Sequence, residues 1–406
     1  MMTTLRSTVL ATALLLGMAV TSVPASDWPH WLGPHGDNLA PAGESFDPDL
    51  SKWKVAWTAG VGRGYSSVVV ANGRAVTLGH DQKSQETVFC FDATSGQVLW
   101  KHAYDAKLLP VMHPGGPNAT PTVVGDRVII VSKDGQVHCL SAEKGDEIWS
   151  FNLVTGADLK LPQWGFASSP VIDGNQVLLS GGKVVALDLA SGKVLWTSKT
   201  AYPAGYTTVV PFESAGKKAL ACLDGKGLSI LTAAAGEELA RYPFSSMFDM
   251  TATTPMILAQ GKRIFISGNT SSVLLSFDNE KLSSIWTSKD IKNAMNNSVI
   301  FDGVLYGIDG AQGNPSSRLV SINLEDGKVN WAKADFGYGN TIGIGSMLLA
   351  LTENGELVTA KPSASAYAET ARKQVLGKLC WTTPVYAEDR IFVRNDRGEV
   401  VCLSRL

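Results

Sequence analysis

The residues of this chain with the clearest potential for binding are aromatic and amide side chains that recur in front of predicted strands. They lie in eight Ser/Thr-rich segments, of which the first begins at Tyr65 and the last at Cys380. The seven intervals between these segments cover 315 residues, so the mean spacing is 45 residues. Flat aromatic area beside a few oriented polar groups is what a ligand-binding mouth uses. The candidate binding residues are Tyr65, Asn118, Trp164, Phe166, Tyr206, Asn296, Asn297, Tyr338 and Trp381, with Met250 and His113 beside them.

Sequence motifs for catalysis or metal binding are absent. The six histidines are scattered, with neither a His-Glu-x-x-His motif nor a close Cys/His cluster. His30, His35 and His113 could meet at a metal, but exposed loops are the favoured interpretation. The Ser-rich segments lack the Gly-x-Ser-x-Gly context of a nucleophile elbow, and Asp249 is read as a turn or capping residue. We therefore predict no catalytic residue and no metal site.

The elements that position these residues come from a second recurring pattern, Asp-x-x-x-Gly-x-x-x-Trp. Clear copies run from Asp92 to Trp100 and from Asp188 to Trp196, and a weaker copy ends in Ala240 instead of Trp. Gly permits the positive φ of a tight turn, and Trp on the following strand is a large apolar plate that can cover a neighbouring unit. The residues predicted to have this structural role are Trp57, Trp100, Trp149, Trp196, Trp286 and Trp331.

Each unit contains turns such as Gly125-Asp126 followed by β-branched strands such as Val128–Val131, which are hairpin signals. A sheet of three or four short strands cannot bury both faces alone, and radial stacking solves this problem. A period near 45 with four strands per unit predicts an all-β fold, an eight-bladed β-propeller of four-stranded antiparallel blades. Its seventh blade is degenerate after Leu357.

The closure of the ring is also predicted by the sequence. The last repeat, from Trp381 to Leu406, ends before any Trp-bearing strand. The segment Lys52–Trp57 resembles the Trp-bearing strand that ends at Trp196. We expect this N-terminal strand to complete the last blade, so that residues 26–406 form one propeller domain. Trp28, His30 and Trp31 precede it and are expected to seal the edge of a blade.

Residues 1–25 are interpreted as a signal peptide. Arg6 supplies a positive start, Val9–Val20 is an apolar run, and Val23-Pro24-Ala25 offers small residues for cleavage. The run is short for a transmembrane helix, and no Cys follows it, so a lipid anchor is not expected. An uncleaved anchor is the less favoured alternative. We expect an exported protein, periplasmic or extracellular.

Charge and cysteine content narrow the classes of partner. Lys plus Arg number 35 against 37 acidic residues, without a basic stripe, which argues against nucleic-acid binding. The five cysteines are an odd number, and three of them occupy equivalent places in their repeats: Cys90, Cys139 and Cys402. The favoured interpretation is that these cysteines are small, buried apolar residues. A disulfide bond remains an alternative.

The repeat resembles that of the pyrroloquinoline-quinone-like (PQQ-like) β-propeller family over the whole chain after residue 26. This superfamily includes quinoprotein alcohol dehydrogenases and BamB, the propeller subunit of the outer-membrane β-barrel assembly machine. The opening Trp28-Pro-His-Trp-Leu-Gly-Pro is similar to the start of many exported PQQ-like propellers. The resemblance implies the fold more specifically than the function. The missing lipid-anchor cysteine departs from BamB.

Three hypotheses on function follow from the resemblance and the residues. The first is a noncatalytic, BamB-like scaffold, a monomer that binds a protein or peptide in the cell envelope and needs no cofactor. The second is a quinone-dependent oxidoreductase with PQQ and Ca²⁺; the resemblance implies adjacent cysteines and a catalytic Asp for it, and no Cys-Cys pair is present. The third is a small-molecule or sugar-binding propeller that uses the aromatic mouth.

Overall fold

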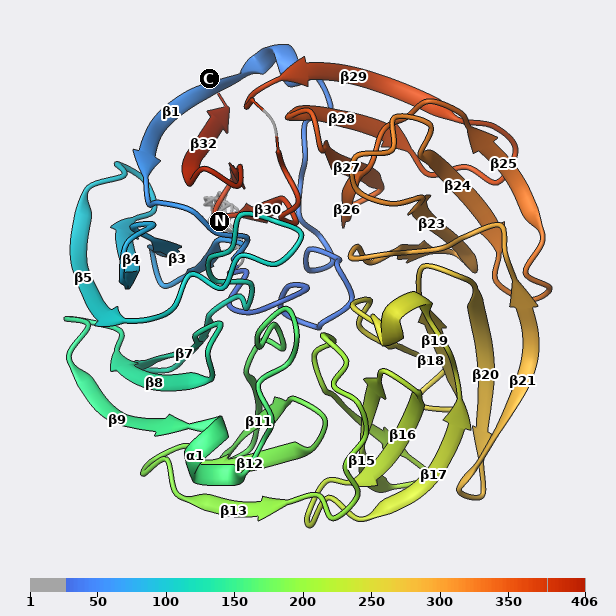
Figure 1. Ribbon diagram of the computed structural model, residues 1–406. Coiled ribbons are helices and arrows are strands. Elements are labelled where there is room, and N and C mark those ends of the chain that lie inside the picture. The colour runs from blue at the N-terminus through green and yellow to red at the C-terminus, as the bar shows by residue number, and fades with distance from the viewer. Residues whose placement is uncertain (1–26, 378, 406) are drawn as a thin grey trace, which may run out of the picture.

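The computed structural model describes residues 27–377 and 379–405, and the interpretation of residues 1–25 as a signal peptide lies outside them. Within the described residues the chain forms eight four-stranded antiparallel sheets, which stand as blades around a common axis (Figure 1). The prediction of an eight-bladed β-propeller is therefore confirmed. In each blade the first strand is nearest to the axis and the fourth lies at the rim.

The first four blades follow one another along the chain. The first has β2 (Val69–Ala71), β3 (Arg74–His80), β4 (Gln85–Asp92) and β5 (Val98–Asp105). The second has β6 (Thr122–Val124), β7 (Arg127–Val131), β8 (Gln136–Ser141) and β9 (Glu147–Asn152). The third has β10 (Val171–Asp173), β11 (Gln176–Ser180), β12 (Val184–Asp188) and β13 (Val194–Thr197). The fourth has β14 (Val210–Ser214), β15 (Lys217–Asp224), β16 (Gly227–Thr232) and β17 (Glu238–Pro243).

The remaining blades continue this order. The fifth has β18 (Met256–Leu258), β19 (Arg263–Ser267), β20 (Ser272–Asp278) and β21 (Lys281–Ser288). The sixth has β22 (Val299–Phe301), β23 (Val304–Asp309), β24 (Arg318–Asn323) and β25 (Val329–Lys333). The seventh has β26 (Gly339–Ile344), β27 (Met347–Thr352), β28 (Glu356–Lys361) and β29 (Ala368–Gln374). The eighth has β30 (Val385–Ala387), β31 (Arg390–Arg394), β32 (Glu399–Arg405) and β1 (Trp53–Gly60).

Helices are few and short in the described part of the chain. They are the 3₁₀ helices η1 (Leu50–Lys52) and η2 (Met247–Asp249) and the α-helix α1 (Leu153–Ala157). None of these helices has the length and apolar character needed to cross a bilayer.

The first hairpin of a blade depends on its turn residues. Asn72 and Gly73 join β2 to β3 with φ of 52° and 72°, and Ala71 pairs directly with Arg74. Such a two-residue loop with positive φ at both positions matches the right-handed twist of the flanking strands. Asn tolerates this conformation better than most residues, and Gly adopts it freely.

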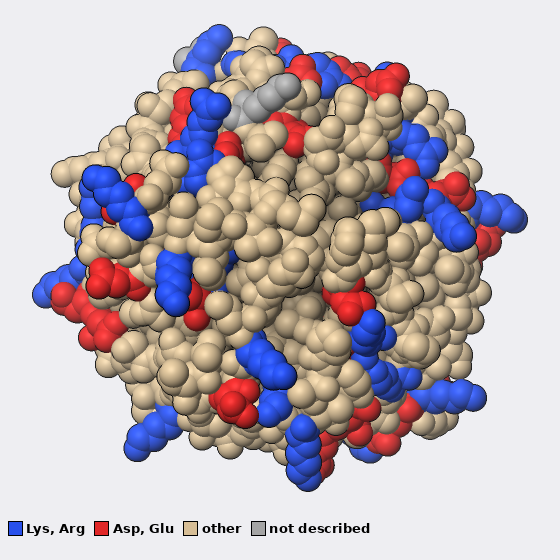
Figure 2. Space-filling view, in the orientation of Figure 1, with Lys and Arg blue, Asp and Glu red and all other residues tan. Residues whose placement is uncertain are grey.

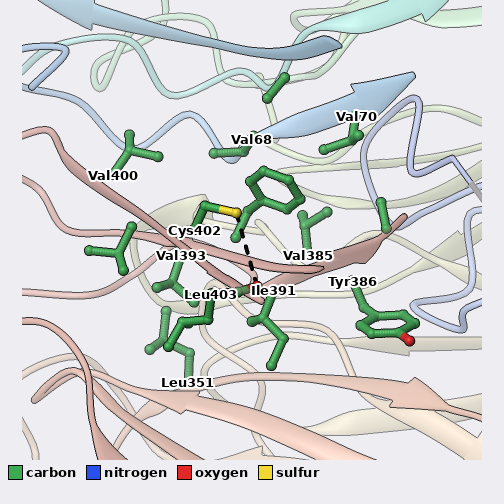
Figure 3. Packing of buried hydrophobic residues seen from close by; sticks show 14 of the residues in the cluster. Val68, Val70, Leu351, Val385, Tyr386, Ile391, Val393, Val400, Cys402 and Leu403 are labelled. Carbon is green, nitrogen blue, oxygen red and sulfur yellow. Dashed lines mark hydrogen bonds between the residues drawn. The ribbon is translucent and has the colours of Figure 1, made fainter. Parts of the chain in front are cut away.

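The N-terminal strand closes the ring, as predicted. Strand β1 pairs antiparallel with β32, with Trp57 opposite Cys402 and a register shift between Val55 and Trp57. Figure 3 shows part of the apolar core of this closing blade, a cluster that contains Val393 and Cys402 together with Val68, which comes just before β2 of the first blade. Ring closure therefore joins the two ends of the described chain through both backbone pairing and side-chain packing.

Each rim tryptophan of the repeat links its blade to the next. The Trp149 indole N–H donates to the carbonyl oxygen of Leu189 at 3.0 Å. A Cβ atom on Gly192 would lie 2.6 Å from the same ring, and Gly192 has φ of 70°. Glycine is thus required there both for its conformation and for the close approach of the ring. The same ring-on-glycine contact joins Trp57 to Gly96, Trp100 to Gly145, Trp196 to Gly236 and Trp286 to Gly327.

The seventh blade departs from this pattern but keeps all four strands. The Trp331 N–H donates to the carbonyl oxygen of Ser363 at 2.7 Å, so the sixth blade still contacts the seventh. Toward the eighth blade, the Lys373 ammonium donates to the carbonyl oxygens of Leu50 and Trp53. A cation bound to backbone carbonyls therefore takes the place of the Trp–Gly contact there.

All five cysteines are buried and free of disulfides: Cys90, Cys139, Cys222, Cys380 and Cys402. Cys90, Cys139 and Cys402 lie on the third strands of three successive blades, β4, β8 and β32. Their role in the structure is that of small apolar core residues.

The segment that precedes β1 crosses the axis of the ring, as the blue trace in Figure 1 shows. Trp28 pairs with Val70 of β2, and Ala40 N–H donates to the carbonyl oxygen of Gly343 in β26. Trp31 N–H donates to Thr254 Oγ1 at 3.1 Å, just before β18. The expectation that this segment seals a blade edge holds for Trp28, which pairs with the innermost strand of the first blade, but is wrong for Trp31, which bonds to the segment before β18.

Candidate binding pocket on the propeller axis

A pocket of about 350 Å³ lies on the axis, formed by the segments that lead into the innermost strands. This volume falls within the range of small-molecule sites. Five residues expected from the sequence line it together: Tyr65, Asn118, Trp164, Tyr206 and Trp381. His113 and Met250, which stand beside them in the repeats, also line the pocket.

The other four expected residues do not line this pocket. Phe166 and Tyr338 are each only 1% exposed and belong to the hydrophobic layers between blades. Asn296 donates through Nδ2 to the carbonyl oxygens of Ile308 and Gly339, both at 3.1 Å. Asn297 donates to the carbonyl oxygen of Thr254 at 2.9 Å. The Nδ2 groups of both amides bind backbone carbonyls and so join neighbouring blades.

Two aromatic pairs form the walls. The Tyr65 and Trp381 rings are stacked, with centroids 5.2 Å apart and planes 20° apart. Trp164 and Tyr206 meet edge to face with centroids 5.5 Å apart. The Trp381 N–H donates to Glu353 Oε1 at 2.8 Å, which fixes the ring's orientation. The walls are therefore preformed apolar planes, which lose little conformational entropy when a ligand binds.

Several lining residues escape prediction from the repeat. Trp31 comes from the N-terminal segment and lies against Thr254. Asn269 and Gln312 come from loops between the second and third strands of their blades. These loops return to the same end of the propeller as the start of the first strand, because successive strands are antiparallel. A sequence search that included these loops, in addition to the segments before the first strands, would have found Asn269 and Gln312.

Two exposed apolar side chains border the pocket. Met112 is 86% exposed and Phe248 is 69% exposed. Both have positive φ, 57° for Met112 and 61° for Phe248, a conformation that is costly for residues with a large side chain. The surrounding loops thus hold two large apolar groups in contact with water at the mouth, where a ligand or partner can reach them.

The lining is uncharged among the described residues, since it contains no Asp, Glu, Lys or Arg. Burial and the neighbouring Lys133 lower the pKa of His113 to about 4, so this imidazole is neutral at pH 7. Burial raises the pKa of Tyr65 to about 12, which keeps its phenol protonated. Figure 2 shows the same tendency on the face it presents, where uncharged residues surround the centre and charged ones lie mostly toward the rim.

A buried polar cluster lies behind His113. Lys133 Nζ is 3.2 Å from His113 Nε2, and burial lowers the pKa of Lys133 to about 8. In the first blade Glu86 is fully buried, and its Oε2 accepts from the Tyr104 hydroxyl at 2.7 Å. Burial raises the pKa of Glu86 to about 7, against the opposing hydrogen bond from Tyr104.

Replacing Glu86 with glutamine should change the pH dependence of stability. The pKa of Glu86 is raised from 4.5 to about 7 in the folded state, so the fold favours the protonated carboxyl. Its contribution to the free energy of unfolding is therefore complete below pH 4.5 and is lost as the pH rises through 7. We expect Glu86→Gln to gain stability relative to wild type at pH 8 and to lose that gain at pH 5. The urea unfolding midpoints of both proteins at pH 5 and pH 8 test this prediction. The same difference between variant and wild type at the two pH values would contradict it.

Comparison with known proteins agrees with the fold. Residues 46–210 match a family described as outer membrane protein assembly factor BamB. The chain is 25% identical to the outer membrane protein assembly factor BamB of Burkholderia pseudomallei over 291 residues, which cover 61% of this chain and 72% of that protein. It is 25% identical to the protein of the same name from Bordetella pertussis over 365 residues, covering 78% and 88% of the two chains.

Solved structures share the architecture at low identity. BamB from Moraxella catarrhalis superposes with a TM-score of 0.61 at 13% identity, covering 87% of this chain and 97% of that chain. A europium-containing methanol dehydrogenase superposes with a TM-score of 0.69 at 12% identity, covering 92% and 89%. At these identities the likeness concerns the fold. The eight closed blades and their repeated Trp–Gly contacts make the chain a β-propeller, and these matches show that it is similar to BamB.

Proposed function

We propose that this protein is a noncatalytic binding propeller, exported to the periplasm, where it holds an apolar segment of a protein partner in a BamB-like role. The observation that carries the proposal is the axial pocket, which is uncharged, aromatic and bordered by exposed apolar side chains. The relatives named as outer membrane protein assembly factors support the envelope role.

The chemistry of the pocket favours an apolar group on the partner. The stacked rings of Tyr65 and Trp381 and the edge-to-face pair of Trp164 and Tyr206 offer planes for an aliphatic or aromatic side chain. Met112 at the mouth can adapt its flexible thioether side chain to different segments. A charged group would lose its hydration there without gaining an ionic partner.

The lining does not fit PQQ with Ca²⁺, the group that the fold family implies. Calcium binds six to eight oxygen ligands, usually including carboxylates, and none of the described lining residues carries a carboxylate. The carboxylates of PQQ itself would also meet no Lys or Arg side chain in the lining. The five cysteines are separate and buried in the blades, so they offer no pair of adjacent sulfurs. These residues support a role without this cofactor.

A neutral sugar or another small polar molecule is the second candidate. The amides of Asn118, Asn269 and Gln312 lie among the aromatic walls, and Gln312 Oε1 is buried without a hydrogen-bond partner. An aromatic plane with nearby amides can hold a sugar ring by stacking and by hydrogen bonds to its hydroxyls. The same pocket would then hold the ligand without contact to a protein.

Site-specific photocrosslinking in living cells distinguishes these two functions. A benzophenone amino acid at position 112 should crosslink to a protein of the outer-membrane assembly machinery. The matched control is position 98, where Val98 is also exposed but lies on the rim strand β5. Adding Trp164→Ala should sharply reduce the crosslink from position 112, because removing a buried aromatic anchor commonly costs about 2 kcal/mol of binding energy.

The opposite outcomes are equally clear. Crosslinks from positions 98 and 112 to the same proteins at the same yield would contradict the pocket as the binding site. Absence of any protein crosslink at position 112, together with sugar binding that quenches tryptophan fluorescence and is lost in Trp164→Ala, would favour the second candidate. Cell fractionation in the same experiment tests the periplasmic location, and size-exclusion chromatography tests the expectation of a monomer.

A further inference from the structure

A second cluster of functional groups lies away from the axis, where the first blade meets the second. Along the rim strand β5, Trp100, His102 and Tyr104 occupy alternate positions and so share one face of the sheet. Trp100 donates to the carbonyl oxygen of Ala142 in the second blade. The His102 ring accordingly lies 5.7 Å, between centroids, from the ring of His138 on β8.

His138 and Glu147 already bring two potential ligand atoms together. His138 Nδ1 lies 2.6 Å from Glu147 Oε2, so an ion bound by both side chains would take the place of the proton that they share. The His138 residue is only 6% exposed, and Nε2 is buried without a hydrogen-bond partner.

The surrounding residues hold this imidazole in place. The Tyr104 ring packs on His138 with centroids 4.4 Å apart, and its hydroxyl donates to Glu86. Ser150 Oγ donates to Glu147 Oε1 at 3.0 Å, which orients the carboxylate. Glu147 is exposed, so an ion can reach the cluster from solvent. Two of the three groups are thus fixed by packing and hydrogen bonds before any ion binds.

We propose that His102, His138 and Glu147 form a binding site for Zn²⁺ at the junction of the first two blades. The three side chains offer ligand atoms that all lie within 4.8 Å of one another. Two imidazoles and a carboxylate suit Zn²⁺, which binds nitrogen and oxygen ligands at about 2.0–2.2 Å. A small rotation of the half-buried His102 side chain brings its ligand atom to the same ion. An ion there joins β5 to β8 and β9 and stabilises the junction.

The sequence predicts no metal site because no local motif marks this one. His102 on β5 and His138 on β8 are 36 residues apart, and Glu147 lies on yet another strand, β9. The cluster forms only because neighbouring blades bring β5 against the second blade. The alternative set of His30, His35 and His113 does not form such a cluster among the described residues.

Zinc titration of the chelator-treated protein tests the site. Isothermal calorimetry should show one Zn²⁺ bound per chain, and Co²⁺ as a spectroscopic probe should give visible d–d bands from nitrogen and oxygen ligands. His102→Ala and Glu147→Gln should each lower the affinity at least tenfold, because losing a ligand costs no less than losing an outer-shell partner. Zn²⁺ should raise the Tm of the wild type but not that of His102→Ala. His35→Ala, which changes an exposed histidine outside the cluster, should behave as wild type.

Failure to bind one Zn²⁺ per chain at saturating concentration would overturn the proposal. So would an affinity in His102→Ala equal to that of the wild type, because the ion would then be bound elsewhere. His138→Ala removes a buried ring and is expected to destabilise the fold. His102 is half-buried, so the His102→Ala variant, with a native circular dichroism spectrum, is the one that tests the site. This outcome does not depend on the proposed function of the axial pocket.

Discussion

Replacement of Trp149 by alanine is expected to lower the free energy of unfolding by about 3–5 kcal/mol. The ring is 8% exposed and lies directly over Gly192 of the third blade. Its N–H also donates to the carbonyl oxygen of Leu189 at 3.0 Å. Alanine would leave a cavity at the blade junction and a carbonyl group without its donor. A large fall in the midpoint of urea unfolding is the expected measurement.

Trp149→Phe is the matched control for this variant. Phenylalanine keeps an aromatic plate over Gly192 but cannot donate to Leu189, so it should cost clearly less than alanine. If the two variants lost the same stability, the hydrogen bond rather than ring packing would join the blades. If neither lost stability, the Trp–Gly contact would have no structural importance, contrary to our interpretation of the repeat.

Replacement of Arg394 by methionine should lower the free energy of unfolding by about 3 kcal/mol. Arg394 lies on β31 of the closing blade and is fully buried. Its guanidinium donates to the carbonyl oxygens of Leu78 at 2.6 Å and Ser66 at 2.9 Å, and to Thr77 Oγ1 at 2.9 Å, all in the first blade. It also donates to the carbonyl oxygens of Gly62 and Gly64.

Methionine can fill part of the same volume but offers no donor, so several buried acceptors lose their partner together. Removing the guanidinium also removes its own desolvation cost, which is visible in the lowering of the pKa of Arg394 to about 10 by burial. This gain offsets part of the loss and keeps the expected effect near 3 kcal/mol rather than higher. The ring-closing junction should therefore open more readily in the variant.

Arg263→Met provides the comparison. Arg263 also lies on the second strand of its blade, but its guanidinium pairs with the exposed Glu325 at 2.6 Å. An exposed ion pair contributes about 0–1 kcal/mol. Urea unfolding of both variants, with amide hydrogen exchange of β1 and β31 as a local measurement, tests the assignment. Equal losses for Arg394→Met and Arg263→Met would refute the role of Arg394 in closure.

Much of the fold follows from the sequence because each blade repeats the same local interactions. The turn glycine and the rim tryptophan recur at a fixed spacing, and each pair joins only neighbouring blades. The missing rim strand of the last repeat has its counterpart at Trp53–Gly60, and β1 does pair with β32. The course of the segment before β1 does not follow from the sequence, because its contacts with Val70 and Gly343 belong to no repeat.

The candidate pocket was predictable only in part. The repeat locates the segments that lead into the innermost strands, and therefore the ring of positions around the axis. It does not determine which side chain of a segment turns toward the axis. Trp164 lines the pocket, whereas Phe166, two residues later, packs against Gly135 and Gly181. Gly165 between them has φ of 74°, so simple alternation of side chains does not apply.

The sequence by itself therefore determined the architecture, the number of blades, the closure of the ring and the general position of the mouth. These depend on interactions within a repeat or between adjacent repeats, and their signal returns about every 45 residues along the chain. Only the tertiary structure decided which residues line the pocket, where the N-terminal segment runs, and that His102, His138 and Glu147 meet. Those features depend on side-chain directions and on contacts between blades, which no single repeat encodes.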